Sequence, residues 1–322
     1  ALDQAGVHIQ LLSEGSEIPS SAGALSDLNA AFLGDGLSIA VTEDCTGERP
    51  IGLLHIDSTD EAVGVSQTRI VIDVAANSRA KFVECQVSSG DPAHYSNSVI
   101  DCRLGAEAQV DYLRLQNRAV AHCHTGLLHA ALGAQSEFRH AAYDLGGKLV
   151  RSDLHIDIGG PDARATLAGL YLANAAQHID NHTRVDHRVG PARSDQEYRG
   201  ILAGSARCVW NGKAVVHEGA DGTDANQANH NLLLSERAEI DAKPELEIYA
   251  DDVKCSHGTT VGQLDESALF YLRTRGIDEA VARQLLTRAF AQRIVDAAPL
   301  EIAQPLIGEL VAAKLEQISA GT

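Results

Sequence analysis

The chain has 322 residues, of which 44% are hydrophobic and only 4% aromatic, and its formal net charge is −18. This length suffices for one large domain or two ordinary ones. An acidic chain repels phosphate backbones, so we expect no nucleic-acid partner. The sequence contains no run of about 18 apolar residues, so we expect no membrane span and no membrane partner.

The chain begins at Ala1, and it contains no methionine. We therefore expect an N-terminal truncation and interpret residues 1–60 as a lead-in segment that remains of an N-terminal region. Its first residues lack the basic and apolar stretches of a secretory signal peptide. Within the lead-in, "SDLNAAFLGDGLSIAV" (26–41) predicts a short helix that runs into a strand.

Six cysteines lie far apart along the chain, and no CxxC pair occurs among them. This pattern is neither a disulfide scaffold nor a zinc ribbon. Scattered thiols without a signal peptide indicate a reducing cytosol, so we expect a cytoplasmic protein. The cysteines are Cys45, Cys85, Cys102, Cys123, Cys208 and Cys255.

The middle of the chain, residues 61–264, repeats itself loosely. Stretches such as "AANSRAKFVECQ", "LGAEAQVDYLRL" and "LGAQSEFRHAAY" begin with turn-forming or small residues and then alternate apolar and polar side chains. The small residues Ala80, Ala108, Ser136 and Ala165 recur about every 28 positions, and later intervals are longer. A strand pattern with such a period predicts a solenoid of stacked coils, because each coil covers the apolar face of the next. A β-sandwich with a fortuitous period remains an alternative, whereas a propeller would carry aromatic signatures.

The last segment, residues 265–322, has helical patterns instead. "DESALFYLRTRG" offers Asp265 as an N-cap and Gly276 as a C-terminal stop. A second helix is expected from Asp278 to a point before Pro299, and a third over 306–318. We expect these amphipathic helices to form a small C-terminal domain that caps the end of the solenoid, with a partner-binding face as an additional role.

Standard nucleotide-binding signals are missing, because the sequence contains neither GxxxxGK[ST] nor a GxGxxG that follows a strand. This chain is therefore expected to bind no nucleotide itself, and any ATP would be bound by another polypeptide. The GxSxG motif of serine hydrolases is missing too.

Fourteen histidines supply candidate metal ligands. One group is His178, His182 and His187, but on a strand the spacing of five places the last two on opposite faces. Another is His122 with His124, which would share a face. A metal site is possible chemistry for each group, and a solvated outer wall is the alternative that we favour.

Cys255 and His257 differ from these histidines in position, since they lie at the end of the repeat region. Strand side chains alternate, so a spacing of two places thiol and imidazole on one face. The two groups suit borderline metals such as iron and zinc. Further ligands are lacking nearby in the sequence, so a closed metal site would need ligands from another subunit. A buried cysteine beside a surface histidine is the alternative.

The same region carries a family resemblance. "NHNLLLSERAEIDAKPELEIYADDVKCSHGTTVGQLDESALFYLRTRGI" (229–277) resembles the SufB/SufD family of the SUF iron–sulfur cluster assembly system. "GLYL", "DNHTRVDH", "RGILAGSARCVWNGK" and "NAAFLGDGLSIAV" extend the similarity over most of the chain. Where SufB has a pattern of the type EHEATTSK, this chain reads "CSHGTTVGQL", so it resembles the SufD branch.

The resemblance implies a mainly β fold, a right-handed parallel β-helix followed by a C-terminal α-helical domain that docks the ABC-type ATPase SufC. It also implies pairing with SufB through β-helix edges, and a possible homodimer when the chain is alone. A transient iron or iron–sulfur cluster would form at that junction, with His257 as a ligand and Cys255 beside it. The family's N-terminal helical domain is expected to be missing here.

We therefore expect a non-enzymatic scaffold subunit of a cluster assembly complex. Two other classes remain open. One is a purely structural β-helix assembly protein that carries no metal. The other is a β-helix carbohydrate-active enzyme, which would use carboxylate clusters along a groove of the solenoid.

Overall fold

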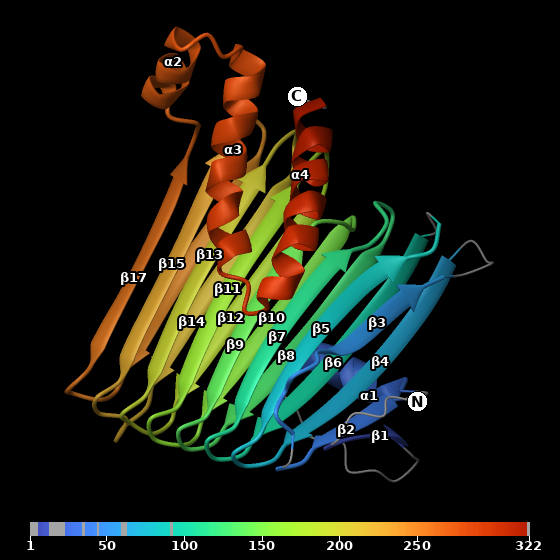
Figure 1. Cartoon of the computed structure of the whole chain (residues 1–322), viewed down its shortest axis with the longest axis vertical. Coiled ribbons are helices and arrows are strands. Elements are labelled where there is room, and N and C mark those ends of the chain that lie inside the picture. Colours follow the sequence, from blue (N-terminus) through green and yellow to red (C-terminus); the bar gives the residue numbers. More distant parts are fainter. Residues whose placement is uncertain are drawn as a thin grey trace.

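The computed structural model describes residues 6–12, 23–33, 36–43, 45–58, 63–90 and 93–320, and it shows a solenoid of parallel strands with the C-terminal helices on one side (Figure 1). Successive strands alternate between two sheets, so each coil contributes one strand to each. In register, Leu149 pairs with His178, and Arg207 with Glu239, which confirms a period near 30 that lengthens late in the chain. The expected parallel β-helix is thereby confirmed.

Sheet A contains nine strands among the described residues. In spatial order they are β1 (Val7–Leu12), β2 (Gly36–Val41), β4 (Val63–Val74), β6 (Ala93–Leu104), β8 (Cys123–Leu132), β10 (Leu149–Ile158), β12 (His178–His187), β14 (Arg207–Val216) and β16 (Glu239–Ile248). All neighbours are parallel except β1, which runs antiparallel to β2.

Sheet B contains eight strands in the same part of the chain. From the C-terminal end they are β17 (Lys254–Gly262), β15 (Asp224–Leu233), β13 (Arg193–Leu202), β11 (Arg164–Ala173), β9 (Glu137–Asp144), β7 (Gln109–Asn117), β5 (Arg79–Ser88) and β3 (Ile51–Asp57). Every neighbouring pair is parallel.

The space between the two sheets, here called the lumen, is filled by alternate side chains of each strand. Ile72, Phe82 and Tyr112 are among the fully buried residues of its apolar core. Because strand side chains alternate, the remaining residues of each strand face outward. The lumen also contains many buried polar side chains, which the repeat pattern alone did not predict.

Of the four small residues named for the repeat, Ala108 and Ser136 occupy the turn before a strand. The residues that stand directly before a strand in successive coils are Ser78, Ala108, Ser136 and Ala163. The carbonyl of each accepts a hydrogen bond from the first strand residue of the next coil, as the Gln109 amide donates to Ser78. The alignment of Ala80 and Ala165 with Ala108 and Ser136 was therefore wrong by two positions. The structural equivalents are Ser78 and Ala163. Ala80 and Ala165 are buried strand residues instead.

The lead-in forms the expected short helix, α1 (Ala24–Ala31), followed by β2. The C-terminal segment forms α2 (Glu266–Thr274), α3 (Glu279–Asp296), the short 3-10 helix η1 (Glu301–Ala303) and α4 (Gln304–Ala320). Asp265 caps α2 as expected, accepting a hydrogen bond from the Ser267 amide at 2.9 Å. The last helix begins before Pro305, which the first turn of a helix tolerates.

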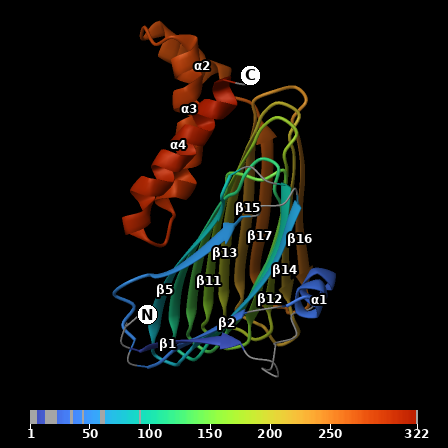
Figure 2. The same ribbon diagram turned by 90° about the vertical axis from the view of Figure 1, so that its right-hand side faces the viewer.

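The helices do not cap the solenoid, which corrects one expectation. Figure 2 shows α3 and α4 along the outer face of sheet B. There Ile294 and Ile307 join an apolar cluster with Leu170 and Ile201 of the sheet. The Tyr143 hydroxyl also donates to the Ile294 carbonyl at 2.8 Å. Because the helices lie on the side, β16 and β17 remain uncovered by them. Among the described residues, no helix combines the length and apolarity needed to cross a membrane.

Candidate functional site

Cys255 and His257 lie on β17, the last strand of sheet B (Figure 1). In the described part of the chain, β17 pairs with β15 on one side and with no strand on the other. Its outer edge therefore presents unpaired backbone groups, which is the usual template for a further strand.

The register places both side chains toward the mouth of the lumen. Cys255 pairs with Ala225, and His257 pairs with Gln227. Ala225 and Gln227 are buried in the lumen, with 0% and 4% exposure. Stacked residues of in-register parallel strands point the same way. Cys255 and His257 thus stack on inward-facing residues of β15, in the last coil of the described solenoid.

The two residues differ in environment. Cys255 is half-buried, and His257 is exposed. Burial, and secondarily the charge of Asp224, raise the pKa of the Cys255 thiol, so the neutral thiol is favoured in the isolated chain. In the described residues, no group of three His, Cys, Asp or Glu side chains could hold a metal ion. The pair alone is therefore two ligands short of a tetrahedral site.

At the same end of the lumen, the last described strand of sheet A is β16. Pro244 lies in its centre, opposite Gly212 of β14. Outward-facing charges on β16 are paired within the sheet, as in the ion pairs of Arg207 with Asp241 and Lys213 with Glu247, both near 2.7–2.8 Å. Proline and charged residues are common devices on edge strands.

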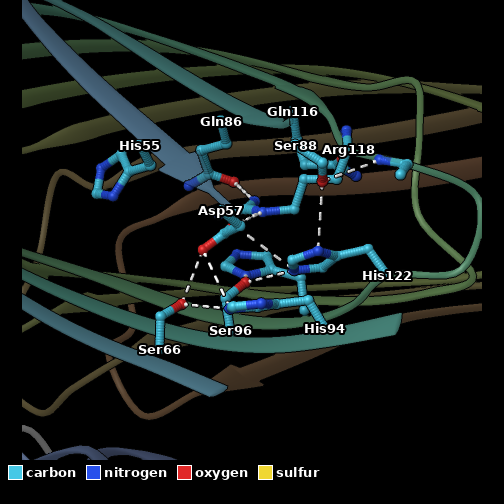
Figure 3. Close-up of polar contacts among 12 residues, drawn as sticks. His55, Asp57, Ser66, Gln86, Ser88, His94, Ser96, Gln116, Arg118 and His122 are labelled. Atoms are coloured by element: carbon cyan, nitrogen blue, oxygen red, sulfur yellow. Dashed lines mark hydrogen bonds and ion pairs between the residues drawn. The ribbon is translucent and has the colours of Figure 1, made fainter. Parts of the chain in front are cut away.

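A second group of polar residues fills the lumen near the N-terminal end of the solenoid (Figure 3). We call it the lumen cluster, and its members are Asp57, Ser66, Gln86, Ser88, His94, Ser96, Arg118, His122 and His124. The centre is an ion pair in which the Arg118 Nε–H donates to Asp57 Oδ2 at 2.7 Å. Both side chains are less than 10% exposed.

The histidines of the lumen cluster surround that ion pair. The rings of His94 and His122 stack with centroids 5.1 Å apart. Ser96 Oγ lies 2.8 Å from both His122 Nε2 and His124 Nδ1. Burial, and then the positive charge of Arg118, lower the pKa of His122 to about 4 and that of His124 well below its usual range. The imidazoles of His122 and His124 are therefore neutral near pH 7.

The lumen cluster is not arranged as a Ser-His-Asp relay. Ser66 Oγ lies 3.2 Å from His94 Nε2, but it donates directly to Asp57 Oδ1 at 2.8 Å. His94 Nδ1, which an orienting carboxylate would contact, has no hydrogen-bond partner among the described residues. The low pKa of His122 also makes it a weak base. This arrangement fits a structural network better than a hydrolytic centre.

The other histidine candidates do not form metal sites in the described residues. His122 and His124 share a face as expected, but both face the lumen and bind Ser96. His182 faces outward and contacts Asp180 at 2.9 Å, whereas His187 is buried beside Ser194. His178 is half-buried on the outward face of the same strand. The expected change of face between His182 and His187 is thus confirmed.

Sequence reasoning missed most of the lumen cluster. Asp57, His94 and Arg118 come from two strands and a turn that are up to 61 residues apart. The signal that could have found them is the recurrence of Ser, His and Gln at inward-facing positions of successive coils. A solenoid places such positions directly above one another.

Comparison with known proteins agrees with the geometry. Residues 55–290 match the family model "SUF system FeS cluster assembly, SufBD core domain". A SufBD family protein of Synechocystis, slr0076, is 32% identical over 297 residues, covering 90% of this chain and 66% of that protein. The iron–sulfur cluster assembly protein SufD of Escherichia coli is 34% identical over 264 residues, covering 80% of this chain and 62% of its own length. This chain thus spans about two thirds of these relatives or slightly less, and it belongs to the SufBD family of SUF iron–sulfur cluster assembly proteins.

Proposed function

We propose that this chain is a non-catalytic scaffold subunit that pairs with a SufB-like subunit through the β-helix edge. The observation that carries the proposal is the unpaired edge of β17 with Cys255 and His257 at its lumen mouth. A strand added by the partner would continue sheet B and bring its own side chains beside these two. The junction would then supply the ligands that this chain lacks.

The species held at that junction is a transient iron ion or nascent iron–sulfur cluster, and it is cargo rather than a resident cofactor. Imidazole and thiolate are both suitable iron ligands. Binding of the metal removes the thiol proton, so the raised pKa of Cys255 makes that residue the weaker contributor until iron arrives. His257 is exposed and needs no displacement of neighbouring side chains to reach a partner's ligand.

The experiment is anaerobic reconstitution with iron, sulfide and the SufB-like and SufC-like subunits, followed by cluster absorbance. His257→Ala should reduce cluster formation severely, and Cys255→Ala more mildly, while complex size by light scattering stays unchanged. Thr259→Ala is a matched control, because Thr259 is exposed and shares the strand and face of His257. A His257→Ala complex that assembles clusters at the wild-type rate would refute the proposed ligand role. The chain alone is expected to form a homodimer through the same edge.

The C-terminal helices, in residues 265–322, are proposed to dock the SufC-like ATPase. They expose large apolar side chains, including Phe270 at 69%, Tyr271 at 57% and Val281 at 46%. A cleft of about 130 Å³ between α3 and α4 adds Leu285 and Leu315. Exposed apolar side chains and an apolar surface cleft are each typical of a protein interface. A Phe270→Ala/Tyr271→Ala double variant should lose ATPase binding in pull-downs and retain the SufB-like subunit.

The same proposal assigns the chain to a reducing cytoplasm. Its six cysteines are all free, and three of them, Cys45, Cys102 and Cys208, are buried. Burial raises the pKa of the Cys102 and Cys208 thiols far above their usual range, so these two are inert small side chains.

The structural alternative, a β-helix that assembles without metal, predicts that neither Cys255 nor His257 affects reconstitution. The carbohydrate-active alternative finds no particular support in the described residues. Outward-facing aspartates of sheet A, such as Asp180 and Asp186, are held in ion pairs with arginines. An assay with uronate polymers should therefore show no turnover.

A further inference from the structure

A small cavity lies in the lumen near the middle of the solenoid, well away from the β17 edge. Its volume is about 30 Å³. On the side of sheet A it is lined by Ser98, Gly126 and Asn181 from β6, β8 and β12, and on the side of sheet B by His140 of β9. Gly126 pairs in register with Ser98 and with Ser152, which in turn pairs with Asn181, so these residues form one inward-facing row.

Three buried polar atoms belong to residues that line this cavity and have no hydrogen-bond partner among the described residues. They are His124 Nε2, His140 Nδ1 and Asn181 Nδ2. The exposed fractions of these residues are 0%, 4% and 3%. Buried polar atoms in native proteins are nearly always satisfied by protein or by ordered water. Three residues that carry such atoms line one cavity, and this coincidence points to a bound molecule.

The charged side chains around the cavity favour neither an anion nor a cation as the bound molecule. Arg114 and Glu84 both line it. Arg114 donates to Asp144 at 3.0 Å, and Glu84 accepts from the Tyr112 hydroxyl at 2.8 Å. An anion would be repelled by Glu84 and a cation by Arg114, so an uncharged molecule is favoured. In the described chain no set of three ligating side chains could hold a metal ion here.

The volume of the cavity suits a molecule of the size of water. A water molecule needs roughly 10–15 Å³ of such cavity space and two to four polar partners. A cavity of about 30 Å³ therefore holds one or two water molecules. Gly126 provides part of this room, because a methyl group there would lie 2.9 Å from His124 Nε2 and 3.4 Å from Ser98 Oγ.

We propose that this lumen cavity is a structural hydration site, in which one or two water molecules bind His124 Nε2, His140 Nδ1 and Asn181 Nδ2. The site goes beyond the proposed assembly function and uses none of its residues. The bound water extends the chain of hydrogen bonds from Ser96 through His124 across the lumen to His140, and thereby joins sheet A to sheet B.

The test is a high-resolution crystal structure of the whole chain, together with water-to-imidazole NOE measurements on the labelled protein. The wild type should show water density within hydrogen-bond distance of at least two of the three atoms, and long-lived water contacts at His124 and His140. His187 is the internal control, because its Nδ1 is also unpartnered in the described chain but does not line the cavity. Its ring should show no such contact.

Gly126→Ala is the decisive variant. Gly126 has no positive φ, so its backbone accepts alanine, and the new methyl group occupies the site. Both water signals should disappear in this variant, and its Tm should fall. Gly52→Ala is the matched control, since a Cβ there meets no atom within 4 Å, and it should leave the water signals intact. An empty wild-type cavity, xenon density in a crystal under pressure, or anomalous bromide density at the site would each overturn the proposal. The wild-type measurements decide the matter even if Gly126→Ala does not fold.

Discussion

His257 lies directly beyond Gln227 in the parallel register of β15 and β17. Gln227 is 4% exposed, whereas the imidazole one rung later is exposed to solvent. Gln227 and His257 thus lie on neighbouring strands of sheet B, yet the first is buried in the lumen and the second lies at the open edge. The proposed iron ligand is consequently an interior position that lacks the next coil, and in the proposed function a partner provides that coil.

The buried ion pair of the lumen cluster should contribute far more to the free energy of unfolding than surface ion pairs do. Asp57→Asn removes the charge that compensates Arg118, and both side chains are less than 10% exposed. Leaving one buried partner uncompensated typically costs about 3 kcal/mol or more. We expect a decrease of that order in the free energy of unfolding measured in urea. Asp241→Asn, which breaks an exposed pair with Arg207, should produce no measurable change. Equal effects of the two substitutions would contradict this account.

Stability should decline in mildly alkaline solution because of His129. Contacts with Asp101 and Asp157, at 3.7 and 3.0 Å, raise its pKa from 6.5 to about 9. A raised pKa in the folded state means that the stabilisation is complete below pH 6.5 and is lost as the pH rises through about 9. Urea unfolding between pH 6 and 10 should show this decline, and His129→Gln should flatten it. A variant whose decline is as steep as that of the wild type would show that another group is responsible.

The buried neutral histidines should produce the opposite trend in acid. Burial lowers the pKa of His187 to about 4, and its ring is fully buried beside Ser194 Oγ at 2.8 Å. In the unfolded chain this histidine takes up a proton near pH 6.5, whereas in the folded chain it does so only near pH 4. The free energy of unfolding therefore falls as the pH decreases from 6.5 to 4. This one group accounts for roughly 3 kcal/mol over that range. His187→Gln should show a shallower acid transition by circular dichroism, and an unchanged transition would argue against its contribution.

The helices should be anchored to sheet B mainly by apolar packing. Ile294 of α3 is fully buried in the cluster with Leu170 and Ile201. Ile294→Ala removes three buried carbons and should lower the free energy of unfolding by about 3 kcal/mol. Hydrogen exchange of α3 amides should accelerate in parallel. Ile302→Ala is the control, because Ile302 is 80% exposed, and it should leave both measurements unchanged. Similar behaviour of the two variants would disprove apolar anchoring.

Local patterns predicted the elements well, because propensity and capping act over a few residues. Asp265 caps α2 as expected, and the "SDLNAAFLGDGLSIAV" stretch forms a helix followed by a strand. The equivalent positions of the repeat were harder to identify. Ala80 and Ala165 were aligned with turn residues, although both are in strands. A small side chain suits a turn and a crowded lumen equally, so residue size alone does not distinguish the two.

Contacts between distant coils were less predictable than elements. His122 and His124 were expected to share a face, and they do, but their partner Ser96 lies a full coil earlier. Which sheet the helices would cover depended on an apolar patch whose buried residues come from five strands, and no single segment displays that patch. The edge position of Cys255 and His257, in contrast, followed from their place at the end of the repeats, because a solenoid must finish where its repeats stop.

The antiparallel pairing of β1 with β2 makes the two ends of the solenoid unlike. If a second copy approached head to tail, its β16 would lie beside β1 on the side of sheet A. Because β1 runs in the reversed direction, the two strands could pair only antiparallel. A head-to-tail contact of the described solenoid would therefore make a mixed sheet on the side of sheet A and a parallel sheet on the side of sheet B, where β3 is parallel to β5.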